Sequence, residues 1–372
     1  MSENALRRDK TEHLDGVTLF ELALTVIIVA IHAYANTAPT LTPGALPVHD
    51  AVYIVRRVVM LGMPGFIFTA GMKYAMSRKK RAYFRYLGGR VKRVYLPYVV
   101  WCAVYYLYFC FFAAPRFAYD FSPEALGSYI LRGNLVSHLY FVVIIMQFYI
   151  LAPAVLKFAK LFRAAGDKLA GSSGRTLLRA APTAALAVLA AAAQFLAIAL
   201  SRRYPNAVMW DRVFPYYIFF WVLGTCAGLD IDRAVAFIRR RQLAVAAAAA
   251  VPAAAYAVLF IKGYYGHGWH RYIEELRVLA AAGEMFILLT VCLRVRFGRL
   301  SGVMNKLHGA SFYVYLAHPL AIYAVTARAL PDRFSARFTV VFAAALVPAA
   351  ALACGYVVIK DKLKRKLNKG LR

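Results

Sequence analysis

The chain has 372 residues, of which 62% are hydrophobic and only 17% are charged. Soluble domains are nearer about half apolar and about a quarter charged, so this composition argues against a soluble enzyme, a disordered chain or a nucleic-acid-binding module. The formal net charge of +29 lies in short clusters between long apolar runs, which favours a polytopic membrane protein over a nucleic-acid-binding protein.

Ten apolar runs are candidates for transmembrane helices, because about 20 apolar residues cross a bilayer core of roughly 30 Å. They cover residues 16–36, 51–74, 95–114, 138–158, 180–200, 214–229, 243–261, 275–293, 309–328 and 336–358. The sixth run is short, the fifth and seventh are rich in alanine, and Pro252 interrupts the seventh. The first run exceeds a signal-peptide core and has no small-residue cleavage site, so we expect it to be retained. The sequence therefore predicts an all-α polytopic membrane protein with about ten transmembrane helices.

Lysine and arginine residues alternate between the two sides of the predicted bundle. The tails and the loops after even-numbered runs hold 33 of them, the loops after odd-numbered runs hold 11, and Arg56 and Arg57 lie inside the second run. Because cytoplasmic loops carry the excess of basic residues, both termini are predicted to be cytoplasmic. We expect an N-terminal tail over residues 1–15, a single membrane domain over 16–358 and a basic tail over 359–372. Most of these charges are expected to face anionic lipid headgroups.

Residue patterns for metal, redox or nucleotide chemistry are missing from the sequence. The five cysteines lie within or beside apolar runs without paired spacing, so neither a disulfide framework nor a zinc site is expected. The sequence contains no P-loop, glycine-rich dinucleotide motif, His-Glu-x-x-His or nucleophile elbow. We therefore expect no metal and no permanently bound cofactor.

Ionisable side chains inside membrane spans are costly and are functional hypotheses by default. The candidates are Glu21, His32, Arg56, Arg57, His138, Glu284 and His318. With a rise of about 1.5 Å per residue, His32, Arg56 and His138 share a level near the outer ends of their spans. His318 lies nearer the middle of the ninth span, and Glu21 lies about three turns from His32 toward the cytoplasm.

Each candidate also has a structural interpretation. A buried His318 can be hydrogen-bonded packing, and His138 can simply line a helix mouth. Arg56 and Arg57 point about 100° apart, so at most one is expected to face the interior while the other reaches the interface. Glu284 is either a proton-relay or ion-coupling group or the structural partner of a buried arginine. The 25 tyrosines are expected mostly in interfacial or lipid-facing belts.

Several segments carry motifs that occur together in one family. They are Val29–Ala33, Met63–Gly71, Tyr86–Tyr98 with its Arg-x-x-Arg-x-x-x-Pro-Tyr pattern, His138–Phe141 with Gln147–Tyr149 and Pro153, and Ser311–Pro319. In this order they resemble the acyltransferase-3 family of integral membrane acyltransferases, which modify cell-surface glycans. Within it, Arg56…Gly62-x-Pro64-x-Phe66 with Val142–Phe148 is most similar to the branch from the intercellular-adhesin (poly-N-acetylglucosamine) biofilm system. That branch is discussed both for polysaccharide export and for O-succinylation.

The resemblance implies where the functional pair of the family lies. That pair is an arginine and a histidine separated by ten residues in the first span, and the histidine position corresponds to His32. Glu21 occupies the arginine position, which reverses the charge, and Ala70 replaces the serine of the family's Ser-Gly pair. Either another basic residue replaces the arginine, or this protein has lost or altered the acyl-transfer step.

The resemblance also implies the chemistry. The expected donor is cytoplasmic acyl-coenzyme A, bound as a substrate, and the expected acceptor is a hydroxyl of a surface or exported polysaccharide. His32 as general base and Arg56 as oxyanion or acceptor ligand are the expected catalytic residues. The substrate-binding candidates are His138, His318, Arg57 and Glu284. Arg90 and Arg93 are either the ligands of the donor phosphates or charges that only set topology.

Three functions are consistent with these observations. A membrane O-acyltransferase would move an acetyl or succinyl group from acyl-coenzyme A to the polysaccharide. A transporter or flippase would move the glycan or a lipid-linked precursor; the intramembrane charges are compatible with that alternative, and Glu21 favours it. A non-catalytic scaffold would belong to a polysaccharide synthase complex, a partner that the other two functions also allow. The expected location is the bacterial cytoplasmic (inner) membrane, with the lipid bilayer as a partner and no nucleic acid.

Overall fold

The computed structural model describes residues 3–37, 47–77, 82–113, 122–171, 176–328 and 330–370. These residues fold mainly into helices and contain no β-strand, which confirms the predicted all-α class. Residues 78–81, which belong to the basic cluster after the second predicted span, lie outside the described residues. The chain divides into two compact units, one of Met1–Gly65 with Val235–Arg372 and one of Phe66–Ala234.

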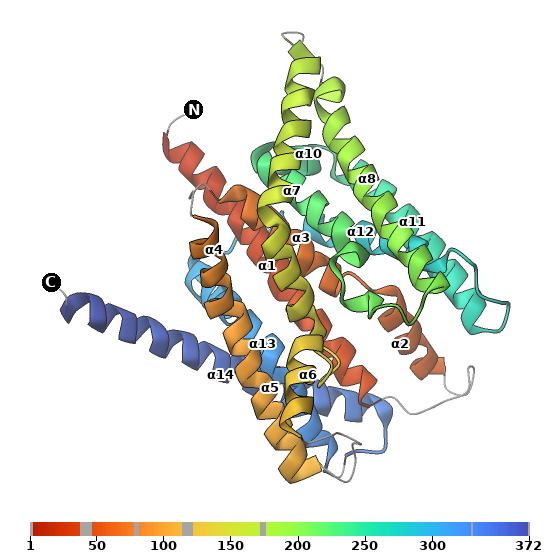
Figure 1. Ribbon diagram of the computed structural model, residues 1–372, viewed down its shortest axis with the longest axis vertical. Helices are drawn as coiled ribbons and strands as arrows, with labels where there is room; N and C mark the ends of the chain where they lie inside the picture. Colours follow the sequence, from red (N-terminus) through yellow and green to blue (C-terminus); the bar gives the residue numbers. More distant parts are fainter. Residues whose placement is uncertain are drawn as a thin grey trace. The chain divides into compact units, whose positions relative to one another are not determined.

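The first unit is built around its N-terminal helix. Its helices are α1 (Glu3–Ala35), α2 (Pro47–Val58), α11 (Gln242–Tyr264), α12 (Ile273–Cys292), α13 (Ser301–Thr326) and α14 (Phe334–Gly370), with the first turn of α3 (Gly62–Met76) and the later part of α10 (Ile231–Arg240). Helix α1 packs on α12, α13 and α14, while α11 pairs with α12 and also contacts α2. Figure 1 shows α13 and α14, the two blue helices, lying against each other.

Small side chains bring α14 close to its neighbours. Val341, Ala345, Ala349 and Ala353 recur every four residues, so they share one face of α14, and all four are buried. The same cluster contains Val29 and Ala33 of α1 and Ala310 and Val314 of α13. Small residues between membrane helices let the backbones approach and accumulate van der Waals contacts. This packing holds α1 beside α13, where the candidate site lies.

The second unit contains the rest of α3 and the helices up to α9. They are α4 (Tyr83–Arg90), α5 (Leu96–Tyr108), α6 (Pro123–Arg132), α7 (Tyr140–Ala170), α8 (Thr176–Arg203) and α9 (Ile218–Leu229), with π-helical turns at Val91–Tyr95 and Phe109–Ala113. Helices α7 and α8 lie side by side in Figure 1, and α9 packs on both. Gln147 of α7 fastens the segment before α9, because its Nε2 donates to Arg212 O at 2.7 Å and its Oε1 accepts from Phe214 N at 2.9 Å.

Two glycines of α9 allow a very close approach to α3. A Cβ atom on Gly224 would overlap with the carbonyl oxygen of Phe68, and one on Gly228 would overlap with that of Met72. The two glycines are four residues apart, which places them on one face of α9 in the small-xxx-small pattern of membrane helix pairs. Beside this contact the Trp221 ring stacks on Phe148 with centroids 4.9 Å apart, which completes the core of the second unit.

Seven helices in the described part of the chain are long and apolar enough to cross a membrane, and the pair α9 and α10, interrupted at Asp230, would make eight. The seven are Asp15–Ala35, Asp50–Met76, Tyr83–Phe112, Tyr140–Ala170, Leu177–Arg203, Gln242–Tyr264 and Phe334–Ile359. They match predicted runs one to five, seven and ten. The chain is therefore a multi-pass membrane protein, while the count of ten and the cytoplasmic termini stay predictions.

The eighth and ninth predicted runs also form helices, but these two helices are too polar to be counted among those that can cross a membrane. They are α12, of 20 residues, and α13, of 26 residues. Their polar side chains include Glu274, Glu275, Arg277 and Glu284 in α12 and Lys306, His308 and His318 in α13. The predicted basic tail over 359–372 continues α14 as helix to Gly370, because lysine, arginine and leucine are strong helix formers.

Candidate functional site

Two histidines lie ring to ring between α1 and α13 of the first unit. His32 stands in the last turn of α1, and its ring centroid lies 5.3 Å from that of His318, with the ring planes inclined by 48°. His318 is fully buried and His32 is half-buried. The fold thus brings together two of the predicted site residues from the first and ninth predicted spans, and His32 faces another helix of the protein.

Pro319 explains how the His318 ring is held. A proline has no N–H, so the carbonyl of Tyr315, four residues earlier, loses its helical partner. His318 Nδ1 fills that place, 2.8 Å from Tyr315 O and 3.2 Å from Val314 O. Because a carbonyl can only accept a hydrogen bond, Nδ1 carries the proton, and in the neutral ring Nε2 is the basic nitrogen. The His-Pro sequence therefore sets both the orientation and the tautomer of the imidazole.

Arg56 provides a cation near His32. Its Cζ lies 5.3 Å from the ring centroid of Tyr34, which follows His32 by two residues and is buried. A guanidinium over an aromatic face is held by cation–π attraction. Arg56 is also close enough to His32 for its charge to act on the imidazole. Arg57 points elsewhere: it is exposed, with its Cζ 5.9 Å from the Phe260 ring, so only Arg56 belongs to this group.

Sequence reasoning missed Tyr34 and Asp50. Tyr34 resembled the many interfacial tyrosines, and Asp50 stands immediately before the second predicted run, so it is not among the ionisable residues inside the predicted spans. Asp50 is buried, and its Oδ1 accepts a hydrogen bond from Tyr264 OH at 2.8 Å, which ties α2 to α11. The sequence did offer one signal for Asp50: it is an acidic residue less than two helical turns before the Arg56–Arg57 pair, on the same helix.

Glu284 of α12 holds the break between α2 and α3. Its Oε2 accepts a hydrogen bond from Met60 N at 2.9 Å. The helix is interrupted here because Pro64, in the first turn of α3, has no N–H for the preceding turn, and helix N-termini leave N–H groups without helical partners. A carboxylate is favoured at such an N-terminus by hydrogen bonding and by the helix dipole. Glu284 therefore pairs with the backbone, and not with a buried arginine as one sequence interpretation held.

Replacing Glu284 by methionine is expected to lower the stability of the purified protein by about 1–3 kcal/mol, because the Met60 N–H loses its acceptor. Glu284→Gln keeps an acceptor oxygen at the same place and should lose much less. Thermal unfolding in detergent, followed by tryptophan fluorescence, measures both variants. Equal melting temperatures for Glu284→Met and the wild type would contradict this role.

A second polar pair lies on the same helix interface. Glu21 Oε2 contacts His308 Nε2, and Glu21 is buried. Glu21 precedes His32 by eleven residues on α1, and His308 precedes His318 by ten on α13. The two pairs therefore stand about 16 Å apart along helices that run in the same direction. The α1–α13 interface thus carries a carboxylate–imidazole pair at one level and an imidazole pair at the other.

The remaining three candidates lie in the second unit. His138 is buried just before α7 begins at Tyr140, with its ring centroid 5.8 Å from that of Tyr105. Arg90 ends α4, and its Cζ lies 4.6 Å from the Tyr149 ring centroid. Arg93 is exposed in the π-helical turn that follows. Sequence reasoning did not foresee this turn, a feature that is frequent at functional sites.

No metal centre is assembled in the described ranges, where no three His, Cys, Asp or Glu side chains gather closely enough to hold an ion. The ionisable groups that gather at the candidate site are imidazoles and a guanidinium. In the first unit, two imidazoles and one fixed cation can accept a proton and stabilise a developing negative charge.

Comparison with known families shows to which protein family the chain belongs. The acyltransferase-3 model, described as an acyltransferase domain, matches residues 22–358. The chain belongs to the acyltransferase-3 family. Three Staphylococcus aureus relatives, from strains MSSA476, MRSA252 and Mu50, are 26% identical to it over 288 residues, covering 73% of this chain and 71% of each relative. Each carries the name "Probable poly-beta-1,6-N-acetyl-D-glucosamine export protein". No solved structure matches the chain.

Membership in the acyltransferase-3 family gives the charge reversal at Glu21 a structural context. The family match begins one residue after Glu21 and includes His32, Arg56 and His318. At the position that resembles the family's arginine, this acyltransferase-3 protein has a carboxylate whose partner, His308, comes from α13. A basic group is therefore present at this level of the bundle, but a different helix provides it.

Proposed function

We propose that this acyltransferase-3 protein is a membrane O-acyltransferase of the bacterial cytoplasmic membrane. It would transfer an acetyl or succinyl group from acyl-coenzyme A to a hydroxyl of a cell-surface or exported polysaccharide. The observation that carries the proposal is the His32–His318 pair with Arg56 nearby, in a chain that belongs to an acyltransferase family. These groups are suited to proton abstraction and to stabilisation of an oxyanion.

In the proposed reaction, His32 takes the hydroxyl proton as the sugar oxygen attacks the thioester carbonyl carbon. Arg56, held on Tyr34, stabilises the oxyanion of the tetrahedral intermediate. The intermediate expels the coenzyme A thiolate, which takes the proton from the imidazolium, so an ester and a free thiol are the products. His318, fixed through its Nδ1–H to Tyr315 O, acts as a positioning residue that holds the His32 ring.

The other candidates receive roles in binding. Arg57 and His138 are proposed to contact the polysaccharide, since Arg57 is exposed and His138 lies where α7 begins. Arg90 and Arg93 are proposed to bind the phosphates of acyl-coenzyme A. Glu284 is proposed to support the site by holding the α2–α3 break that follows Arg56. No permanently bound cofactor takes part in this scheme.

Polysaccharide export is the second candidate function. It is favoured by the printed names of the Staphylococcus aureus relatives. The pair of buried Glu21 and half-buried His308 also supports it, because intramembrane ionisable pairs occur on ion and substrate pathways. For either function the bilayer is a partner, and a polysaccharide synthase complex is the proposed source of the glycan.

Mass spectrometry of the surface polysaccharide separates the two functions. Cells that lack the protein are compared with cells that express the wild type or His32→Ala at equal levels. For an acyltransferase, O-acyl groups disappear without the protein and return only with the wild type. An unchanged acyl pattern on a reduced amount of surface polysaccharide would identify an exporter and reject the proposed reaction.

A further inference from the structure

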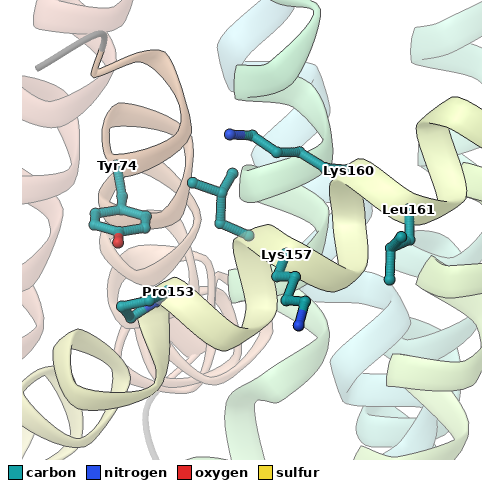
Figure 2. Close-up of a pocket in the computed structure, with 6 residues that line it drawn as sticks. Tyr74, Pro153, Lys157, Lys160 and Leu161 are labelled. Atoms are coloured by element: carbon teal, nitrogen blue, oxygen red, sulfur yellow. The ribbon is translucent and has the colours of Figure 1, made fainter. Parts of the chain in front are cut away.

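The second unit contains an open pocket of about 370 Å³ along α7. Its lining consists of Tyr74 of α3 and Pro153, Leu156, Lys157, Lys160 and Leu161 of α7. Figure 2 shows Tyr74 and Pro153 on one side of the pocket and the two lysines projecting from successive turns of α7. Spacings of three and four residues place Pro153, Lys157 and Lys160 on one face of that helix. A tyrosine, two lysines and the apolar residues Pro153, Leu156 and Leu161 therefore line the same space.

An aromatic cluster connects this pocket with Arg90. The Tyr74 ring centroid lies 5.2 Å from that of Tyr86. The Arg90 Cζ lies 5.3 Å from the Tyr86 ring centroid and 4.6 Å from the Tyr149 ring centroid. Two cation–π contacts hold the guanidinium in place. Because the Tyr86 ring contacts both Arg90 and Tyr74, a third cation lies near the pocket.

Among the described residues, no carboxylate pairs with the lysines of the pocket. In the part of the chain that the structure describes, Lys157 and Lys160 form no ion pair. The next basic residue of α7 behaves differently, because Arg163 Nη2 lies 2.6 Å from Asp230 Oδ1. Both lysines are exposed and are not paired with a carboxylate of the described chain, so an anion is the ligand that matches the pocket.

We propose that Lys157, Lys160 and the Tyr74 hydroxyl form a binding site for a phosphate-bearing ligand. Lysine ammonium groups bind phosphate as point charges, and a tyrosine hydroxyl can donate a hydrogen bond to a phosphate oxygen. Pro153 and Leu156 border the same space and would contact the apolar part of the ligand. The phosphate belongs either to a soluble nucleotide-linked thioester or to the headgroup of an anionic phospholipid. For the soluble source, the inference rests on the proposed function and adds a second phosphate site beside Arg90.

Calorimetric titration of the purified full-length protein tests the soluble source, with coenzyme A and 3′-dephospho-coenzyme A as probes. Lys157→Gln/Lys160→Gln is expected to weaken coenzyme A binding at least about tenfold, because charge-assisted contacts are lost. Lys168→Gln removes an exposed lysine from the last turn of the same helix and serves as the matched control, with affinity unchanged. Lys157→Arg/Lys160→Arg should keep most of the affinity. Thermal unfolding checks that every variant is folded.

Native mass spectrometry with added phosphatidylglycerol or phosphatidylcholine tests the lipid source on the same variants. Selective loss of phosphatidylglycerol adducts in Lys157→Gln/Lys160→Gln, with coenzyme A binding unchanged, would assign the site to a lipid headgroup. A loss confined to coenzyme A would assign it to the soluble ligand. If neither ligand binds more weakly to the double variant than to Lys168→Gln, the inference is wrong.

The outcome is separable from that of the proposed function. His32→Ala leaves the pocket intact, so it should bind coenzyme A or phosphatidylglycerol like the wild type even where it transfers no acyl group. If the glycan carries no acyl modification but the pocket variants still lose phosphate binding, the reaction is rejected and the site stands. Acyl transfer that persists with undiminished phosphate binding in Lys157→Gln/Lys160→Gln would reject the site alone.

Discussion

Replacing His32 by alanine is expected to reduce acyl transfer by about 10²–10⁴-fold, the range that a positioned general base contributes. The reason is that the imidazole next to Arg56 takes the hydroxyl proton in the proposed reaction, and alanine cannot accept it. The measurement is transfer of a radiolabelled acyl group from acyl-coenzyme A to the acceptor glycan by the purified protein. Donor binding, measured by calorimetry, should be unchanged, so the loss should appear in kcat.

Two controls keep this result specific. His267→Ala removes an exposed histidine of the same unit and should leave transfer at the wild-type rate. His318→Ala should also slow transfer, but the double variant His32→Ala/His318→Ala should be no slower than His32→Ala, because residues that act as a unit are non-additive. Transfer at the wild-type rate by a folded His32→Ala protein would overturn the catalytic assignment.

Replacing Gly224 by alanine is expected to lower the stability of the protein by about 1–3 kcal/mol or more. The added Cβ would overlap with the Phe68 carbonyl oxygen, so α9 and α3 would have to move apart. The movement would also disturb the packing of Trp221 on Phe148, one turn away. Thermal unfolding in detergent, followed by tryptophan fluorescence, measures the effect.

Gly127→Ala is the matched control for that variant. Gly127 is exposed inside α6, and a Cβ atom there would meet no atom within 4 Å. Because alanine is a better helix former than glycine by up to about 1 kcal/mol, the same chemical change should be neutral or stabilising at this position. A Gly224→Ala protein as stable as Gly127→Ala would show that the α3–α9 contact is not as close as the structure places it.

Much of the helical architecture was predictable because apolar run length reports directly on membrane spans. The runs beginning at residues 16, 138 and 243 all correspond to long apolar helices. The limits of this reasoning appear at α12 and α13. Both form long helices, but polar residues such as Glu284 and His318 lower their apolar character. A sequence window averages these residues and cannot say that they face a neighbouring helix.

The candidate site was predictable in its residue types and only partly in its grouping. His32, Arg56 and His318 stood out because ionisable groups in apolar runs are costly. That Arg56 rests on Tyr34, while Arg57 points away, depends on the rotation of α2, which no local pattern specifies. The partnership of Glu21 with His308 joins residues 287 positions apart and could not be inferred from spacing.

The amino-acid sequence by itself determined that the chain is helical, that it enters a membrane and that particular histidines and arginines lie in apolar segments where ionisable groups are costly. Those properties follow from transfer free energies, which each residue carries regardless of its neighbours. Only the tertiary structure decided that His32 meets His318, that Glu284 serves the backbone at Met60 and that Lys157 and Lys160 border one pocket with Tyr74. These are contacts between distant segments, and packing between helices selects them because close approach depends on small residues and shape rather than on local composition.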